Sequence, residues 1–278
     1  MTGENSTGEN STGKSSTEHN QHKHDEITIK ENPEHDQHKH DERMWKKVVV
    51  RCRHRFLGRY SSSAAASVVS FDFDSIRNLK PFPSWLAKEM RSNHAGETGA
   101  VYIYKGCLSA VRLRQKCVPG NSWHEYEIEL EKFASEHEKS EQHHLDLLNM
   151  ILKESRDRSV LLPLWKLSGF MLGFTSTIWC PRGMYLTTEA VETFVERHYK
   201  YQIHRLENET SSNDSVQRGR MELKRLLELC CEDEIHHQNE ARDRAAQGPF
   251  PWFLWIDTFW ISLVEKGSAV GAAIAKRV

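Results

Sequence analysis

The chain has 278 residues, of which 38% are hydrophobic and 28% charged, and its formal net charge is −1. This length is sufficient for one domain with a hydrophobic core and leaves residues over for a tail. The near-neutral charge gives no reason to expect nucleic acid as a partner, and six cysteines without a Cys-x-x-Cys spacing do not indicate a small disulfide scaffold.

Residues 1–43 are a low-complexity segment built from short repeats. The units TGENS, TGENS and TGKSS follow one another, and EHNQHKHDE is later repeated as EHDQHKHDE. Such a sequence can bury almost no apolar surface, so we expect a disordered extension.

Residues 44–80 have a different composition. The part from 44 to 70 contains six Lys or Arg, several serines and no acidic residue, and it begins with Met44. This composition is typical of a mitochondrial transit peptide, with a basic linker as the alternative. We therefore predict a transit peptide and linker over 44–80, with Met44 as the working start of translation.

The remaining residues, 81–278, are predicted to form one all-α domain. Apolar residues recur at helical spacing, and no strand pattern is visible after residue 80. Turns are expected at VPGNS, at PRG and at QGPFP. The predicted helices cover 83–116, 123–153, 160–180, 184–208, 216–246 and 251–275.

Two of these helices have a composition that suits a membrane surface. The segment 160–180 is mostly apolar but contains Lys166, and its length is borderline for a membrane span. We favour a helix that lies in the bilayer interface, with a buried core helix as the alternative. The last helix carries Trp252, Trp255 and Trp260, which suit either a membrane interface or ordinary packing.

A repeated pattern of glutamate and histidine runs through four of the helices. A lone glutamate is followed by a Glu-x-x-His pair, and the same order then recurs at nearly equal spacing. Residues i and i+3 lie on one helical face, so each pair can hold the same metal ion. Four carboxylates and two imidazoles from four helices are the donors of a di-iron bundle. The six predicted ligands are Glu97, Glu141, His144, Glu192, Glu234 and His237.

The roles within this set are predicted from position. The lone Glu97 and Glu192 are expected to bridge the two irons, and Asp233 either fixes the tautomer of a ligating histidine or faces solvent. Tyr199 lies two turns after Glu192 and either approaches the site or is an ordinary core residue. Neighbours of the right chemical type are less favoured as ligands: His137, Glu138, His143, Glu232 and His236.

Four segments resemble the signature segments of the demethoxyubiquinone hydroxylase family: NHAGETGAVYIYKG, EQHHLDLLNMIL, AVETFVERHYKYQI and CEDEIHHQNEA. The apolar LPLWKLSGFMLG is also similar to a segment of that family, and the resemblance covers about 85–278. One departure is Thr98, where the family commonly has an aromatic residue.

The resemblance implies a ferritin-like four-helix bundle that holds two iron ions on the six ligands named above, with Tyr199 near the centre. It implies hydroxylation of the ring of a demethoxyubiquinone with O₂, with NADH as the ultimate reductant. It also implies a location on the matrix side of the mitochondrial inner membrane, with membrane lipid and a lipid-binding protein of the ubiquinone biosynthesis complex as partners.

Two other functions fit parts of the sequence. A rubrerythrin-like peroxidase or ferroxidase would share the ligands but would not need two segments suited to a membrane. A non-catalytic scaffold of the quinone pathway would carry the same residues without metal.

Overall fold

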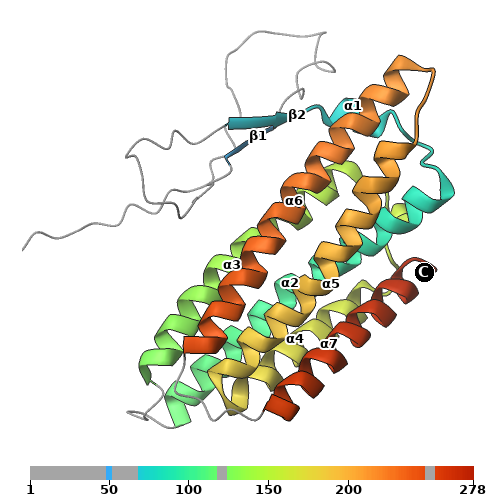
Figure 1. Ribbon diagram of the computed structural model, residues 1–278. Coiled ribbons are helices and arrows are strands. Elements are labelled where there is room, and N and C mark those ends of the chain that lie inside the picture. The colour runs from blue at the N-terminus through green and yellow to red at the C-terminus, as the bar shows by residue number, and fades with distance from the viewer. Residues whose placement is uncertain (1–47, 52–67, 118–123, 248–253) are drawn as a thin grey trace, which may run out of the picture.

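The computed structural model describes residues 48–51, 68–117, 124–247 and 254–278. Within these ranges the protein is mostly helical, as predicted, and its long helices run roughly side by side (Figure 1). Several predicted features lie wholly or largely outside the described residues. They are those of 1–43, most of 44–67, the turn at 118–122, Trp252 and the QGPFP stop at 247–251.

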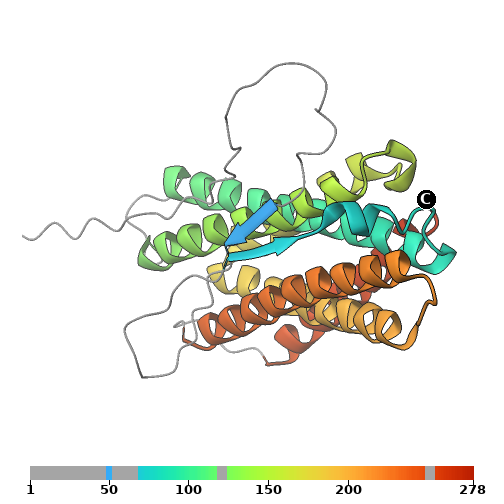
Figure 2. The ribbon, with the colours of Figure 1, turned by 90° about the horizontal axis from the view of Figure 1, so that it is seen from above.

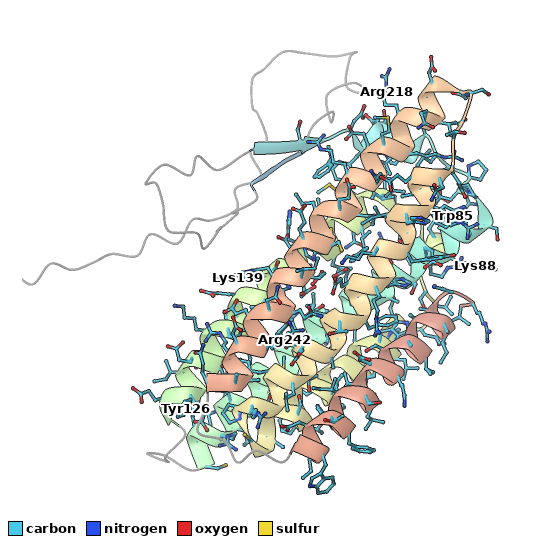
Figure 3. The ribbon with its side chains drawn as sticks, viewed as in Figure 1. Trp85, Lys88, Tyr126, Lys139, Arg218 and Arg242 are labelled. Atoms are coloured by element: carbon cyan, nitrogen blue, oxygen red, sulfur yellow. The ribbon has the colours of Figure 1, made fainter. Side chains whose placement is uncertain are left out.

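Four long helices form the body that carries the glutamate–histidine pattern. They are α2 (Ser84–Cys117), α3 (His124–Ile151), α5 (Pro181–Asn208) and α6 (Asp214–Gln247). Helix α2 packs on α3, and α5 packs on α6. Seen from above, these pairs lie in two layers (Figure 2). Charged side chains such as Lys88, Lys139 and Arg242 lie on the outside (Figure 3).

Two further helices cover the body on one side. Helix α4 (Leu162–Trp179) packs on α2 and α5, and α7 (Leu254–Ala275) packs on α5 and α2. A short 3₁₀ helix, η1 (Ser155–Asp157), lies between α3 and α4. Among the described residues, no helix combines the length and the apolar character that crossing a membrane requires.

The predicted break between the third and fourth helices is confirmed, but it lies at the extended Cys180 rather than at PRG, because α5 begins at Pro181 itself. Proline suits the first helical position, where its missing N–H would have had no partner in the helix. Helix α6 begins after Asn213, whose side-chain oxygen accepts hydrogen bonds from the N–H groups of Ser215 and Val216 at 3.0 and 3.3 Å. These bonds satisfy donors that the first turn of a helix otherwise leaves unpaired.

Ordered structure that packs on the bundle begins upstream of residue 81, where we expect the domain to start. Strand β1 (Val48–Arg51) pairs antiparallel with β2 (Val68–Phe71), and the five-residue helix α1 (Phe73–Arg77) follows. Phe71, Phe73, Ile76 and Leu79 are buried in the core. The Asp72 side chain caps α1 by accepting a hydrogen bond from Ser75 N–H at 3.1 Å.

Helices α2 and α4 meet backbone to backbone. A Cβ atom added at Gly173 would lie 1.8 Å from the carbonyl oxygen of Ile103, and one added at Gly169 would lie 2.3 Å from that of Gly99. Only glycine permits so close an approach. Three apolar side chains of α4 are exposed on its outer side: Leu164, Leu167 and Met171.

The hydrophobic core has two parts along the bundle. One contains α1 together with Leu147, Leu223 and Tyr199, and the other contains Tyr104, Phe133 and parts of α5 and α7. Both apolar clusters include residues next to the buried glutamates and histidines, so these polar groups lie within an otherwise apolar interior.

Candidate metal centre

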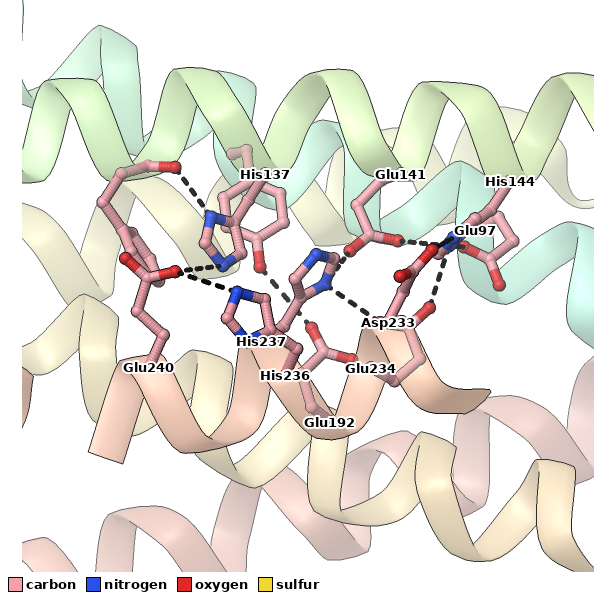
Figure 4. Close-up of polar contacts among 12 residues, drawn as sticks. Glu97, His137, Glu141, His144, Glu192, Asp233, Glu234, His236, His237 and Glu240 are labelled. Carbon is pink, nitrogen blue, oxygen red and sulfur yellow. Dashed lines mark hydrogen bonds and ion pairs between the residues drawn. The ribbon is translucent and has the colours of Figure 1, made fainter. Parts of the chain in front are cut away.

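All six predicted ligands are buried and meet in one place (Figure 4). Each of the four long helices contributes to the cluster, as the repeated pattern predicts. The described residues offer two groups of donor atoms close enough together to hold a metal ion. One consists of Glu97, Glu141, His144 and Glu234, and the other of Glu141, Glu192, Glu234 and His237.

The donor atoms are spaced as ligands of shared cations would be. His144 Nδ1 lies 3.0 Å from Glu234 Oε1, and His237 Nδ1 lies 3.1 Å from both Glu141 Oε1 and Glu234 Oε2. Two ligands at right angles around a cation, with bonds of about 2.1 Å, stand about 3 Å apart.

The two groups share Glu141 and Glu234, whereas Glu97 and Glu192 each belong to only one group. This arrangement favours Glu141 and Glu234 as shared ligands, while the bridging role expected for Glu97 and Glu192 stays a prediction. The glutamates of the Glu-x-x-His pairs take the shared position because α3 and α6 turn these side chains toward each other. The sequence spacing does not reveal this. It shows which residues share one face of a helix, but not toward which neighbouring helix that face is turned when the bundle packs.

Asp233 is placed to orient one imidazole. Its Oδ2 lies 3.2 Å from His144 Nε2, while His144 Nδ1 faces the glutamates. An imidazole that donates one N–H to a carboxylate presents its other nitrogen to a metal, so the predicted tautomer-fixing role is geometrically possible. The contact runs from α6 to α3 rather than to the histidine of its own helix.

Two tyrosines contact the glutamates: Tyr199, which was predicted to approach the site, and Tyr104, which was not. Tyr199 Oη donates to Glu97 Oε1 at 2.5 Å, and Tyr104 Oη donates to Glu192 Oε1 at 3.5 Å. Each tyrosine lies seven residues after one lone glutamate and bonds to the other. The spacing that pointed to Tyr199 after Glu192 would therefore also have identified Tyr104 after Glu97.

The electrostatics of the cluster favour a bound cation. Burial, together with the negative charges of Glu234 and Glu141, raises the pKa of Glu97 well above its usual value, and the pKa of Glu192 is raised for the same reasons. Burial opposes the charged form of His237, but Glu141 and Glu234 outweigh it and raise the pKa of His237 to about 10. Four carboxylates in one buried place need compensating positive charge.

The unpaired atoms of the cluster fit a metal. Glu141 Oε1, Glu234 Oε1 and His144 Nδ1 are buried and lack a hydrogen-bond partner, although they lie close to other donor atoms. Buried polar atoms that lie about 3 Å from one another without forming a hydrogen bond call for an ion or a water between them. A set of carboxylate and imidazole donors suits iron or manganese better than a structural zinc site, which favours thiolates.

A cavity of about 480 Å³ adjoins the cluster. Helices α2, α4, α5 and α7 provide most of its wall, which includes Glu97, Glu192, Tyr199 and the apolar Leu172 and Val264. A molecule in this cavity would be surrounded mainly by apolar side chains and would reach the carboxylates directly.

Comparisons with known proteins agree with this geometry. Residues 84–259 match the sequence model of a family described as "Ubiquinone biosynthesis protein COQ7". A relative from Dictyostelium discoideum, named "NADPH-dependent 3-demethoxyubiquinone 3-hydroxylase, mitochondrial", is 31% identical over 57% of this chain and 64% of its own. A relative from Saccharomyces cerevisiae, named "5-demethoxyubiquinone hydroxylase, mitochondrial", is 29% identical over 57% of this chain and 65% of its own.

The match to these two relatives spans slightly less than two thirds of their length. A relative from Caenorhabditis elegans with the same name as the Dictyostelium protein is 26% identical over 69% of this chain and 90% of its own. The family match includes all six clustered glutamates and histidines and covers more than half of the chain. The chain therefore belongs to the COQ7 family of ubiquinone biosynthesis proteins.

Proposed function

We propose that this protein is a di-iron monooxygenase that hydroxylates the ring of a demethoxyubiquinone in ubiquinone biosynthesis. The observation that carries the proposal is the meeting of four carboxylates and two imidazoles beside an apolar cavity. The names of the relatives support the same reaction. We also propose that α2, α3, α5 and α6 are the four helices of a ferritin-like fold.

Each residue of the cluster has a proposed role in holding iron. Glu141 and Glu234 would contribute to both groups of ligands, Glu97 and His144 would complete one group, and Glu192 and His237 would complete the other. When bound, the two irons supply the activation of O₂, of which one atom enters the ring and the other leaves as water. The reaction takes two electrons, which a nicotinamide nucleotide supplies.

The identity of the nucleotide is open to direct measurement. The family resemblance led us to expect NADH as the ultimate reductant, whereas the names of several relatives specify NADPH. Comparing product formation with each nucleotide, under otherwise identical conditions, decides between them for this chain.

The cavity is the proposed binding site for the quinone ring. Gly96 is exposed within the wall, and a Cβ atom there would meet nothing within 4 Å, so no side chain fills this part of the cavity. The apolar wall excludes water from the ring, which protects the reaction from wasteful side reactions. Tyr199 borders the cavity and holds Glu97 in place through its hydroxyl.

We propose a mitochondrial location, on the matrix side of the inner membrane. The names of the relatives support the organelle. The exposed apolar side chains of α4 and α7 support contact with membrane lipid and with a lipid-binding partner of the biosynthesis complex. On this proposal the hydroxylase domain includes Phe71, Phe73, Ile76 and Leu79, which are buried in its core, so a transit peptide that begins at Met44 would end before them rather than at residue 80.

Replacing one ligand tests the function. Glu192→Ala should abolish both iron loading and ring hydroxylation, because one coordination group loses a carboxylate. Metal content is measured by mass spectrometry, and the quinone product is measured in lipid extracts of a null strain that expresses the variant. Glu207→Ala, which changes an exposed glutamate of the same helix, should leave both unchanged.

The same measurements separate the alternatives. Full hydroxylation by Glu192→Ala would refute the ligand assignment. Rapid peroxide turnover without any action on quinones would favour the rubrerythrin-like peroxidase, and wild-type protein that binds no iron would favour the scaffold.

A further inference from the structure

His137 is a buried imidazole that the proposed metal centre does not use. It lies one helical turn before Glu141 on α3, and only 3% of its surface is exposed. Its Nδ1 lies 2.9 Å from the backbone carbonyl oxygen of Phe133. A carbonyl only accepts hydrogen bonds, so Nδ1 carries the proton and Nε2 presents a lone pair in the neutral ring.

The lone pair of His137 has no hydrogen-bond partner. Glu240 on α6 faces it, with Oε2 at 3.8 Å from His137 Nε2 (Figure 4). Two acceptors therefore face each other across a gap, an arrangement that calls for an ion or a water between them.

Glu240 is held with this oxygen free. Arg244 donates to Glu240 Oε1 from Nε at 2.9 Å and from a terminal nitrogen at 2.8 Å. Oε2 is left to face His137, and it also lies 4.0 Å from His236 Nε2. A single cation with bonds of about 2.1 Å could touch two donors that stand 3.8 Å apart.

These side chains form a graded path from solvent to the metal centre. The exposed fraction of the side chain falls from 63% at His236 to 25% at Glu240 and 4% at His137. The ring centroid of His137 then lies 4.3 Å from that of His237, a proposed iron ligand. Each step brings another nitrogen or oxygen donor within a few ångströms of the next.

We propose that His137 Nε2 and Glu240 Oε2, with His236 at the outer end, form an entry site for a divalent first-row transition metal ion. The ion passes from this site to the neighbouring centre, so this role rests on the proposed metal centre. The site has few donors, and the positive charge of Arg244 lies beside it. Both features make it a weak site, suited to transfer rather than storage.

The rate of metal loading tests the entry site. Metal-free protein is mixed with ferrous iron without oxygen, and the bound iron is measured over time by mass spectrometry. His137→Phe keeps an aromatic ring but removes the lone pair, and Glu240→Gln removes the carboxylate charge near the surface. Both should slow loading about tenfold, the lower end of what loss of a group beside a ligand costs. Both should reach the same final iron content as wild type.

Matched controls and a second measurement separate the proposal from misfolding. Glu228→Gln changes another glutamate of α6 that pairs with a basic residue one turn away, and His204→Phe changes an exposed histidine. Both controls should load at the wild-type rate. Titration with Co²⁺ should show a weak extra equivalent in the wild type that His137→Phe and Glu240→Gln lack, with thermal unfolding of all variants compared.

Each outcome has a separate meaning. Glu240→Gln changes a side chain near the surface. If this variant loads iron at the wild-type rate and binds Co²⁺ as the wild type does, the entry site is refuted and the proposed metal centre is not affected. Binding of Co²⁺ that depends on His137, in a protein whose centre takes up no iron, supports a cation site here but refutes the proposed function and the role in delivery.

Discussion

At the scale of single residues, the cluster is held by contacts that cross from one half of the bundle to the other. Tyr199 on α5 bonds to Glu97 on α2, Tyr104 on α2 bonds to Glu192 on α5, and Asp233 on α6 contacts a histidine on α3. Each contact therefore positions a donor atom and joins two helices that are far apart in sequence.

Asp233 offers the sharpest test at this scale. Asp233→Asn keeps the shape of the side chain but removes the charge that stabilises the orientation of His144. We expect iron affinity to fall about 10- to 100-fold, which competition with a chelator would measure. Asp146→Asn, an exposed change on the helix that carries His144, should leave affinity unaltered. Equal affinities for both variants would mean that Asp233 has no orienting role.

The residues of the cluster were more predictable than their roles. The sequence predicts that the six donors meet, because Glu97, Glu141 and His144 follow one another at a spacing that is repeated in the second half of the domain. The sharing of Glu141 and Glu234, and the contact between His137 and His237, depend on how each helix is rotated about its own axis. Packing of the whole bundle sets those rotations, so no local pattern contains them.

At the scale of elements, the contact between α2 and α4 depends on glycine. Gly173→Ala would place a methyl group 1.8 Å from the carbonyl oxygen of Ile103, so the helices must separate. We expect a loss of about 1–3 kcal/mol or more in the free energy of unfolding, measured by urea denaturation.

Gly267→Ala is the matched control, because a Cβ atom there meets nothing within 4 Å. It should gain up to about 1 kcal/mol, since alanine favours the helix more than glycine does. A similar loss in both variants would mean that the close approach of α2 and α4 is not what matters.

The long helices were predictable because their periodic patterns extend over many turns. Each begins and ends within a few residues of its prediction. The segment before residue 81 was less accessible to sequence reasoning. Helix α1 has only five residues, too few to display a helical period, and Phe71 and Ile76 are buried by helices distant in sequence. Strands β1 and β2 are four residues each and lie in a segment whose composition indicated a presequence.

At the scale of the whole molecule, exposed apolar side chains gather on the two outer helices. They include Leu167 and Met171 on α4 and Trp255, Phe259 and Val270 on α7. A patch of this kind on a folded protein marks a surface that meets a partner or a membrane.

Binding to lipid vesicles tests this surface. Changing Trp255 and Phe259, which are 73% and 64% exposed, to serine should weaken cosedimentation with vesicles of phosphatidylcholine and cardiolipin. Each large apolar side chain contributes roughly 1.5–3 kcal/mol on burial, so the pair should lower binding at least about tenfold. Met221→Ser, on the exposed face of α6, should bind as the wild type does. Unchanged binding of the double variant would exclude α7 from the membrane contact.

The glycines between α2 and α4 also determine how thick the protein is on this side. Because Gly169 and Gly173 touch the α2 backbone directly, no layer of side chains separates the two helices there. Both helices contribute to the cavity wall, and α4 also carries the exposed Leu167 and Met171 on its outer side. If the proposed quinone ring occupies the cavity, a single layer of helix at α4 would separate the ring from the surface where its apolar tail would lie.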